Sequence, residues 1–187
     1  TTEAARSTLV ACVGRGVIGS HRIPTDNKGN VFSQADSAHA YIPRWPNSGT
    51  ALYVAELATG GSGHSVTADN NVTPTDEVTL AVVEVRNGSR ATARWNQVQS
   101  GDPVQSLSVT TSGPATLVAF WWGDADGSVA HAAVPGNGFS RIDAALAAGS
   151  LVQCAVAVRE VQSAGTYSVT WTTTPQQGAQ LWLVAVQ

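Results

Sequence analysis

Acidic side chains are the first residues in this chain that could do chemistry. Glu56 and Glu160 each close an apolar strand pattern, and they stand at corresponding places in two similar stretches. Two carboxylates on one sheet face, about 5–9 Å apart, can act as acid and base in glycoside hydrolysis. A repeat also puts equivalent residues at equivalent corners, which explains the pair without chemistry. A glycan-active enzyme that uses these paired Glu residues is therefore the third hypothesis.

Other catalytic patterns are weaker. Residues 61–65 (GSGHS) place serine and histidine in one turn, but the Gly-x-Ser-x-Gly pattern of a nucleophilic serine is missing. We interpret this turn as a hairpin connection. Glu84 lies on a strand face with Leu80 and Val82, and it needs a partner if buried, for which Arg86 and Arg159 are candidates. We predict that the chain is not an enzyme.

One turn has the residue types of a metal site. Residues 124–128 (DADGS) offer Asp124 and Asp126 at the spacing with which a calcium loop begins. The rest of such a loop is missing, so a structural calcium site and an ordinary hairpin turn both remain open. The four histidines lack a paired ligand spacing, which argues against zinc. Apart from this calcium ion, no cofactor is expected.

Tryptophan is unusually frequent, with 6 residues against 3 phenylalanines. Flat aromatic rings with amide and Arg groups around them suit the binding of carbohydrate. One such ring lies in the most polar strand pattern of the chain, and two lie in a Pro-bounded loop at residues 41–46. The alternative is that these rings cap the ends of the fold. The predicted ligand-binding residues are Trp95, Trp45, Tyr41, Arg44, Arg94, Gln97 and Trp122.

The other tryptophans are predicted in the core. Trp171 and Trp182 lie in apolar strand patterns. Trp121 and Trp122 are adjacent, so their side chains point to opposite faces of a strand. We expect one of them in the core and the other on the second face or at an edge.

The composition excludes several classes of protein. Charged residues make up 12% of the 187 residues, and the 10 basic ones are scattered, which argues against nucleic-acid binding. No apolar run approaches the ~20 residues of a membrane span, and no signal-peptide pattern opens the chain. Low charge and the lack of methionine favour an extracellular protein, secreted or at the cell surface. Cys12 and Cys154 lie in apolar strand patterns, which leaves open two buried thiols or one disulfide.

The chain contains an internal repeat. Residues 7–11 (STLVA) recur as residues 115–119 (ATLVA), and residues 65–67 (SVT) recur as residues 168–170. A Thr-Pro pair follows each SVT, and each half then ends on an apolar strand pattern, at residues 78–85 or 181–186. The shared order predicts half-repeats of about residues 1–101 and 102–187.

The patterns predict an all-β fold. Helical periodicity is almost absent, and its best stretch, residues 142–149, spans one or two turns. Residues 78–86 and 168–174 alternate as half-buried strands do, and turn-forming residues connect the strand patterns. We predict a jelly-roll-like, two-sheet antiparallel β-sandwich. Because neither half could bury its own apolar face, residues 1–187 are expected to form a single domain.

The two halves differ at their starts. A strand pattern at residues 104–109 precedes the second half, and nothing before Thr1 matches it. We expect that the parent protein continues upstream and that the first half lacks a strand. An open sheet edge left in this way could accept a strand from a neighbour.

Several landmarks follow one another in order: residues 8–11 (TLVA), 26–30 (DNKGN), 51–55 (ALYVA), 60–67 (GGSGHSVT) and 82–85 (VVEV). This order resembles that of secreted bacterial β-sandwich modules found in surface proteins and polysaccharide-degrading proteins. The resemblance covers nearly the whole chain through turn and core motifs. It implies carbohydrate binding or surface architecture, and it supplies no catalytic residue.

Two functional hypotheses stand ahead of the enzyme. The leading one is a non-catalytic extracellular carbohydrate-binding module that binds a polysaccharide or an oligosaccharide. The alternative is a structural or adhesive β-sandwich module of a bacterial surface fibre or assembly, which self-assembles through an open sheet edge. Neither hypothesis involves nucleic acid or insertion into a membrane.

Overall fold

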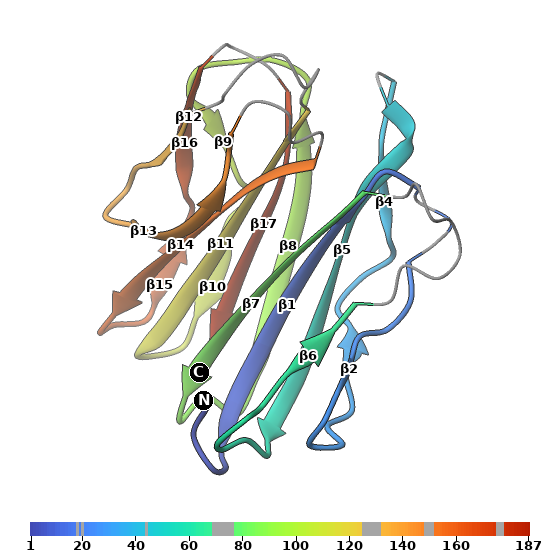
Figure 1. Cartoon of the computed structure of the whole chain (residues 1–187). Coiled ribbons are helices and arrows are strands. Elements are labelled where there is room, and N and C mark those ends of the chain that lie inside the picture. Colours follow the sequence, from blue (N-terminus) through green and yellow to red (C-terminus); the bar gives the residue numbers. More distant parts are fainter. Residues whose placement is uncertain are drawn as a thin grey trace.

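The computed structural model describes residues 1–17, 19, 21–43, 45–68, 77–124, 132–147, 152–174 and 178–187. The secondary-structure elements assigned within these residues are all β-strands, and the paired strands are antiparallel. The predicted all-β class is therefore confirmed. Two sheets of five strands and three smaller sheets build the molecule (Figure 1).

The two large sheets carry most of the chain. The first sheet has the order β3-β5-β1-β7, with β4 also paired to β5, and the second has the order β13-β14-β11-β17-β8. The strands of the first sheet are β1 (Ser7–Arg15), β3 (Ser33–Gln34), β4 (His39–Tyr41), β5 (Trp45–Ala58) and β7 (Val78–Arg86). Those of the second are β8 (Ala91–Val98), β11 (Ala115–Asp124), β13 (Ser140–Ala145), β14 (Val152–Val161) and β17 (Ala179–Val186).

The three small sheets consist of short strands. One pairs β2 with β6, another pairs β10 with β15, and the third has the order β12-β16-β9. Their bounds are β2 (Thr25–Asp26), β6 (Val66–Thr67), β9 (Val104–Gln105), β10 (Val109–Thr111), β12 (Ala132–Pro135), β15 (Gly165–Tyr167) and β16 (Thr170–Thr174).

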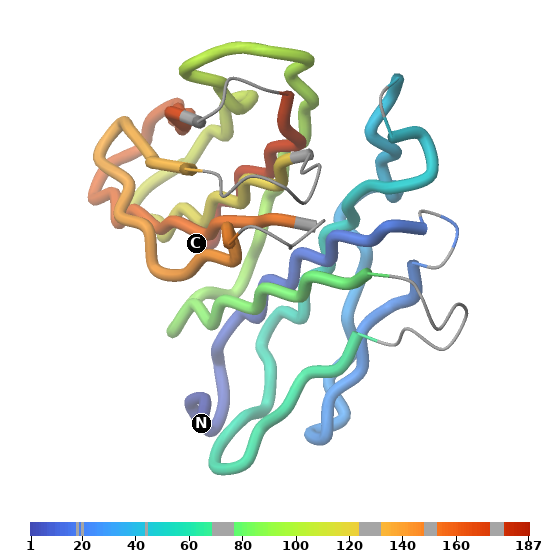
Figure 2. Tube along the Cα trace, turned by 45° about the horizontal axis from the view of Figure 1, so that its top comes forward, coloured from blue at the N-terminus to red at the C-terminus, as the bar shows by residue number. Residues whose placement is uncertain are grey.

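The large sheets pack face to face through an inter-sheet core. Val10 and Leu52 from the first sheet meet Val118, Phe120 and Trp182 from the second in one buried cluster. Figure 2 shows the blue to green strands up to β7 gathered on one side of this interface and the yellow to red strands on the other.

Each large sheet is also buried on its outer face. Leu9, Ala11 and Tyr53 point outward from the first sheet into a second cluster, which Phe32 covers. In the same way, the outer face of the second sheet packs beneath residues of the third small sheet and of the loops beside it. As a result β1 and β17 are buried along their whole lengths. Such strands are nearly continuous apolar runs and do not alternate.

Two sequence-based expectations need correction or completion, and a third is confirmed. The prediction of two sheets is incomplete, because both large sheets are apolar on both faces and smaller sheets and loops cover them. The most helix-like stretch of the sequence, residues 142–149, is not a helix in its described part, since residues 140–145 form β13 and pair with β14. Pairing overrides the helix propensity of the alanines there. Trp171 and Trp182 are core residues as predicted, with 0% and 1% exposure.

One glycine sets how closely the large sheets approach. A Cβ atom placed on Gly14 would lie 2.3 Å from Nε1 of Trp122, so the indole rests directly on the backbone of β1. Trp122 comes from β11, the central strand of the second sheet. The middle strands of the two sheets are therefore in contact where Gly14 leaves room.

Replacing Gly14 with alanine should destabilise the protein by about 1–3 kcal/mol, because the added methyl group overpacks the inter-sheet core. Chemical denaturation followed by tryptophan fluorescence measures this change. Gly113→Ala is the matched control, since nothing lies within 4 Å of a Cβ atom at Gly113. Equal stability of the two variants would contradict the close approach.

Candidate functional site

Trp95 lies on β8, but one face of its ring is already occupied. The ring of His39 stacks on it with centroids 3.6 Å apart and an angle of 6° between the planes. His39 also lies against Trp182, at a centroid distance of 5.5 Å. The indole Nε1 of Trp95 is buried and has no hydrogen-bond partner among the described residues. The expectation of an open stacking surface is therefore wrong for the face that His39 covers.

Tyr41 and Trp122 are buried, with 2% and 3% exposure. Their rings meet edge to face at a centroid distance of 5.8 Å. Trp122 points to the second face of its strand, as expected from its neighbour Trp121, but the first sheet covers that face. Burial between the elements of the fold leaves neither ring an exposed face on which a ligand could stack.

The remaining ligand-binding candidates are dispersed. Trp45, at the start of β5, is 44% exposed. The Gln97 side chain donates a hydrogen bond to the carbonyl oxygen of Ile42. Arg94 is exposed, and strand alternation points it to the opposite face of β8 from Trp95 and Gln97. Arg44 lies outside the described residues.

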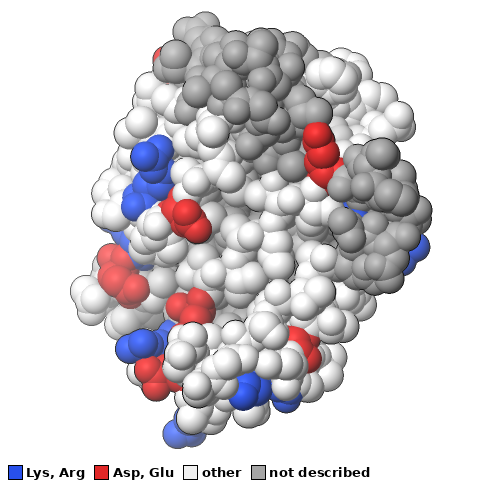
Figure 3. Space-filling model, in the orientation of Figure 1, with Lys and Arg blue, Asp and Glu red and all other residues white. Residues whose placement is uncertain are grey.

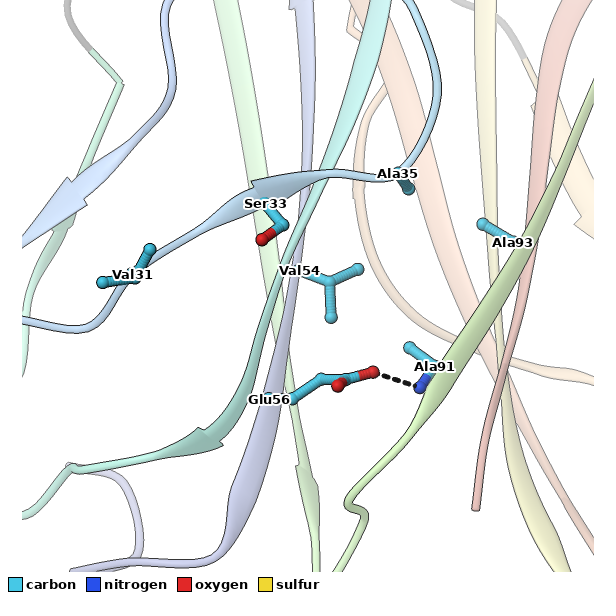
Figure 4. A pocket seen from close by; sticks show the side chains of 7 residues that line it. All are labelled: Val31, Ser33, Ala35, Val54, Glu56, Ala91 and Ala93. Carbon is cyan, nitrogen blue, oxygen red and sulfur yellow. Dashed lines mark hydrogen bonds between the residues drawn. The ribbon is translucent and has the colours of Figure 1, made fainter.

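A groove of about 420 Å³ lies between the edges of the two large sheets. In Figure 4 it is seen between the segment around β3 and the start of β8, with Val54 and Glu56 of β5 at its floor. Among the described residues that line it, Glu56 is the only charged one. The lining residues are Val31, Ser33, Ala35, Val54, Glu56, Ala91 and Ala93.

The wall of this groove formed by β8 is an open strand edge. Among the described strands β8 pairs with β17 alone. Arg90 and Gln187 exchange both of their backbone hydrogen bonds, and hydrogen-bonded positions alternate along an antiparallel pair. The N–H and C=O groups of Ala91 and Ala93 consequently point away from β17. The first of these N–H groups donates to the carboxylate of Glu56 at 2.7 Å.

Glu56 and Glu160 do not share a site. Glu160 accepts hydrogen bonds from the Thr116 hydroxyl at 2.9 and 3.0 Å and lines a different groove. Glu84 accepts from the Ser7 hydroxyl and from the backbone N–H of Glu3, each at 2.7 Å. The arginine partners expected for Glu84 are therefore wrong, and the carboxylates act as local anchors for backbone and hydroxyl groups.

One buried network of three hydrogen-bonded side chains was not predicted from the sequence. Nε2 of His64 lies 2.9 Å from Oδ2 of Asp26, and Nδ1 lies 2.8 Å from the Thr2 hydroxyl. Because a carboxylate only accepts hydrogen bonds, Nε2 donates, and in the neutral ring Nδ1 accepts from Thr2. These three residues come from separate parts of the chain, so no spacing in the sequence signals that they meet.

A hydroxyl bound to an imidazole that is in turn bound to a carboxylate is also the arrangement of a catalytic nucleophile, its base and the group that orients the base. Here, however, the side chains of His64 and Asp26 are only 1% and 0% exposed. The Thr2 hydroxyl also accepts the N–H of Gly61 at 3.1 Å. The hydrogen bonds among these three side chains therefore hold residues 1–4 against the β2–β6 pair. We call Thr2, His64 and Asp26 the polar latch.

The carboxylate of Asp26 has a pKa of about 2, below its ordinary value of 3.8. Burial by itself raises this pKa, but hydrogen bonds from Asn30, His64 and the backbone N–H of Lys28 outweigh burial because they favour the charged form. The polar latch is thus built around a stabilised negative charge.

Charge is sparse elsewhere on the surface. In Figure 3 the charged side chains of the face shown lie mostly toward its left and lower margin, where red and blue ones are next to one another, and the centre of the face is uncharged. The described residues contain no group of three or more His, Cys, Asp or Glu side chains that could hold a metal ion. The predicted calcium ligands lie beyond this description, since Asp126 and the side chain of Asp124 are outside the described residues. No helix in the described ranges is long and apolar enough to cross a membrane.

Comparisons with known proteins give no relative to set beside this site. No family model, no curated protein and no solved structure matches the chain.

The polar latch predicts a specific loss of stability in acid. A carboxylate with a lowered pKa stabilises the fold fully above its unfolded value, near 3.8, and loses this contribution as the pH falls to about 2. Asp26→Asn should lower the free energy of unfolding at pH 7 by about 1–3 kcal/mol. Between pH 4 and pH 2 the free energy of unfolding of the variant should also fall by less than that of the parent.

Urea denaturation at a series of pH values measures both effects. Asp143→Asn is the control, because Asp143 is exposed and should keep the stability and the acid profile of the parent. A parallel loss of stability in the parent and in Asp26→Asn below pH 4 would contradict the role of Asp26.

Proposed function

We propose that this chain is a structural or adhesive β-sandwich module that associates with further copies of itself through the open edge of β8. The observation that supports this proposal is the outward backbone of Ala91 and Ala93 beside a groove with small side chains. An unpaired strand edge is a template for an added strand, and added strands bind mainly through backbone hydrogen bonds. The carboxylate of Glu56 already accepts one outward N–H as a strand carbonyl would.

A second copy of the chain is the occupant to which this proposal commits. Two strands that meet edge to edge around a two-fold axis make the same contacts in both directions and close the interface. Alanine at positions 91 and 93 leaves room beside the backbone. Glu56 is the one charged residue among the described residues that line the groove, and its carboxylate accepts the N–H of Ala91.

We also propose that the chain consists of two related halves in a jelly-roll-like arrangement. The strand order β3-β5-β1-β7 in the first sheet corresponds, strand by strand, to the order β13-β14-β11-β17 in the second. Ala11 pairs with Tyr53 in the first sheet, and Ala119 pairs with Ala157 in the second, in agreement with the repeat in the sequence. Shared burial between the sheets supports one domain, and the resemblance to secreted bacterial surface modules fits such a repeat.

Filling the groove should prevent self-association. Ser33→Arg puts a long cation into the groove from an exposed position, whereas Thr92→Arg puts the same charge on the opposite face of β8. Sedimentation velocity at increasing concentration should show association for the parent and for Thr92→Arg, and a monomer for Ser33→Arg. A monomeric parent at millimolar concentration, or association of Ser33→Arg equal to the parent, would overturn the proposal.

Carbohydrate binding is the second candidate, and the exposed ring of Trp45 favours it. This ring is the one predicted platform with a large exposed fraction, 44%. A stacked sugar would lie on it outside the sandwich. Tyr41, at the start of the same loop, is buried with its ring against Trp122.

If Trp45 binds a glycan, Trp45→Ala should weaken the affinity at least tenfold, since aromatic contacts at a binding hot spot contribute about 1–2 kcal/mol or more. Titration of a panel of plant, algal and microbial glycans, followed by tryptophan fluorescence and melting temperature, measures this loss. Leu107→Ala removes another exposed apolar side chain and serves as the control. A panel that changes neither signal in the parent would end this candidate.

A further inference from the structure

Two cysteines lie on the facing sides of the two large sheets. Cys12 belongs to β1 and is part of the inter-sheet core. Cys154 belongs to β14, where it shares a face with Val156, which lies in the same core. Both thiols are free, and Cys12 is buried while Cys154 is partly exposed. The cysteines are therefore placed on opposite walls of one interface.

The sheets approach closely beside this pair. Cys154 is directly paired with Trp122, and Trp122 rests on Gly14, which follows Cys12 by two positions on the same face of β1. Each cysteine has one small and one large paired neighbour, since Cys12 pairs with Ala81 and Leu52, and Cys154 pairs with Ala145 and Trp122. The contact of Trp122 with Gly14 thus brings the two sheets together next to both cysteines.

The electrostatics of the thiols agree with this placement. Burial raises the pKa of Cys12 well above its ordinary value, and the nearby Cys154 raises it further. Burial also raises the pKa of Cys154 to about 11, against a hydrogen bond from the backbone of Ala145 that lowers it. The effect of Cys154 on the pKa of Cys12 agrees with the placement of the two residues on facing sheets.

We propose that Cys12 and Cys154 form a reversible disulfide that cross-links the two large sheets when the protein meets a disulfide oxidant. A bridge between sheets beside a tryptophan is an established way to pin a β-sandwich, as in antibody domains. This bridge would join the central strand of the first sheet to β14. It would close a loop that contains most of the chain, which is where a cross-link constrains the unfolded state most.

The reaction balances with glutathione disulfide as the oxidant. The partly exposed Cys154 loses its proton to solvent, and its thiolate attacks one sulfur of glutathione disulfide, which releases one glutathione thiolate. The Cys12 thiolate, formed by loss of a second proton, then attacks the Cys154 sulfur and releases the second glutathione. The protein loses two hydrogen atoms, and one glutathione disulfide is reduced to two thiols.

The high thiol pKa values make this reaction slow near neutral pH. Because the thiolate is the attacking form and its fraction rises tenfold per pH unit below the pKa, the first step should be about 100-fold faster at pH 9 than at pH 7. The melting temperature of the reduced protein should not show this 100-fold dependence on pH between pH 7 and pH 9.

The test uses the whole chain, first reduced and then incubated with glutathione disulfide. We expect a monomer that has lost the mass of two hydrogen atoms, with a cross-linked peptide that contains Cys12 and Cys154. Its melting temperature should rise by about 10 °C and return to the reduced value with dithiothreitol. Cys12→Ala and Cys154→Ser should lack both changes, and Cys12→Ser is the second variant if Cys12→Ala fails to fold.

Two results would overturn the proposal. One is a stable mixed disulfide of glutathione on Cys154 with Cys12 still free, which would place the sulfur atoms out of reach. The other is two thiols that remain free under oxidation at pH 9 and react only after unfolding.

Discussion

The packing of two β-sheets that are apolar on both faces is the constraint on which the rest of this structure depends. The first sheet buries Val10 inward and Leu9 outward from the same strand. Apolar surface contributes about 25 cal/mol per Å² when it is removed from water, so both faces need a cover. The facing sheet covers one side, and the small sheets and their loops cover the other.

Because both faces of the large sheets are covered, polar and aromatic side chains between the sheets have to bind one another. Between the sheets, Thr50 donates to Gln180 at 2.7 Å and accepts from the indole N–H of Trp182 at 2.9 Å. The amide of Gln180 in turn donates to the carbonyl of His39. A buried polar group is costly unless it is hydrogen-bonded. Thr50, Gln180 and Trp182 therefore satisfy one another's hydrogen-bonding groups between the sheets.

The features left for interaction lie at the margins of the large sheets. The edge of β8 beside the groove presents backbone groups, and the start of β5 presents the exposed side chain of Trp45. At the other margin, β13 is exposed along its length, but Arg141, Asp143 and a register shift between them interrupt it. Charges and bulges protect an edge from pairing. The edge of β8 is thus the more receptive of the two edges of the second sheet.

The sequence by itself determined the all-β class, the core positions of Trp171 and Trp182, and the opposite directions of Trp121 and Trp122. These features follow from local rules, namely the alternation of a strand and the residue preferences of turns. Only the tertiary structure decided which faces are covered. Trp122 and Tyr41 are typical of a binding surface in the sequence, yet they are buried because a second sheet lies over them. The contact of Asp26 with His64 likewise depends on the pairing of β2 with β6, which joins residues that no spacing in the chain connects.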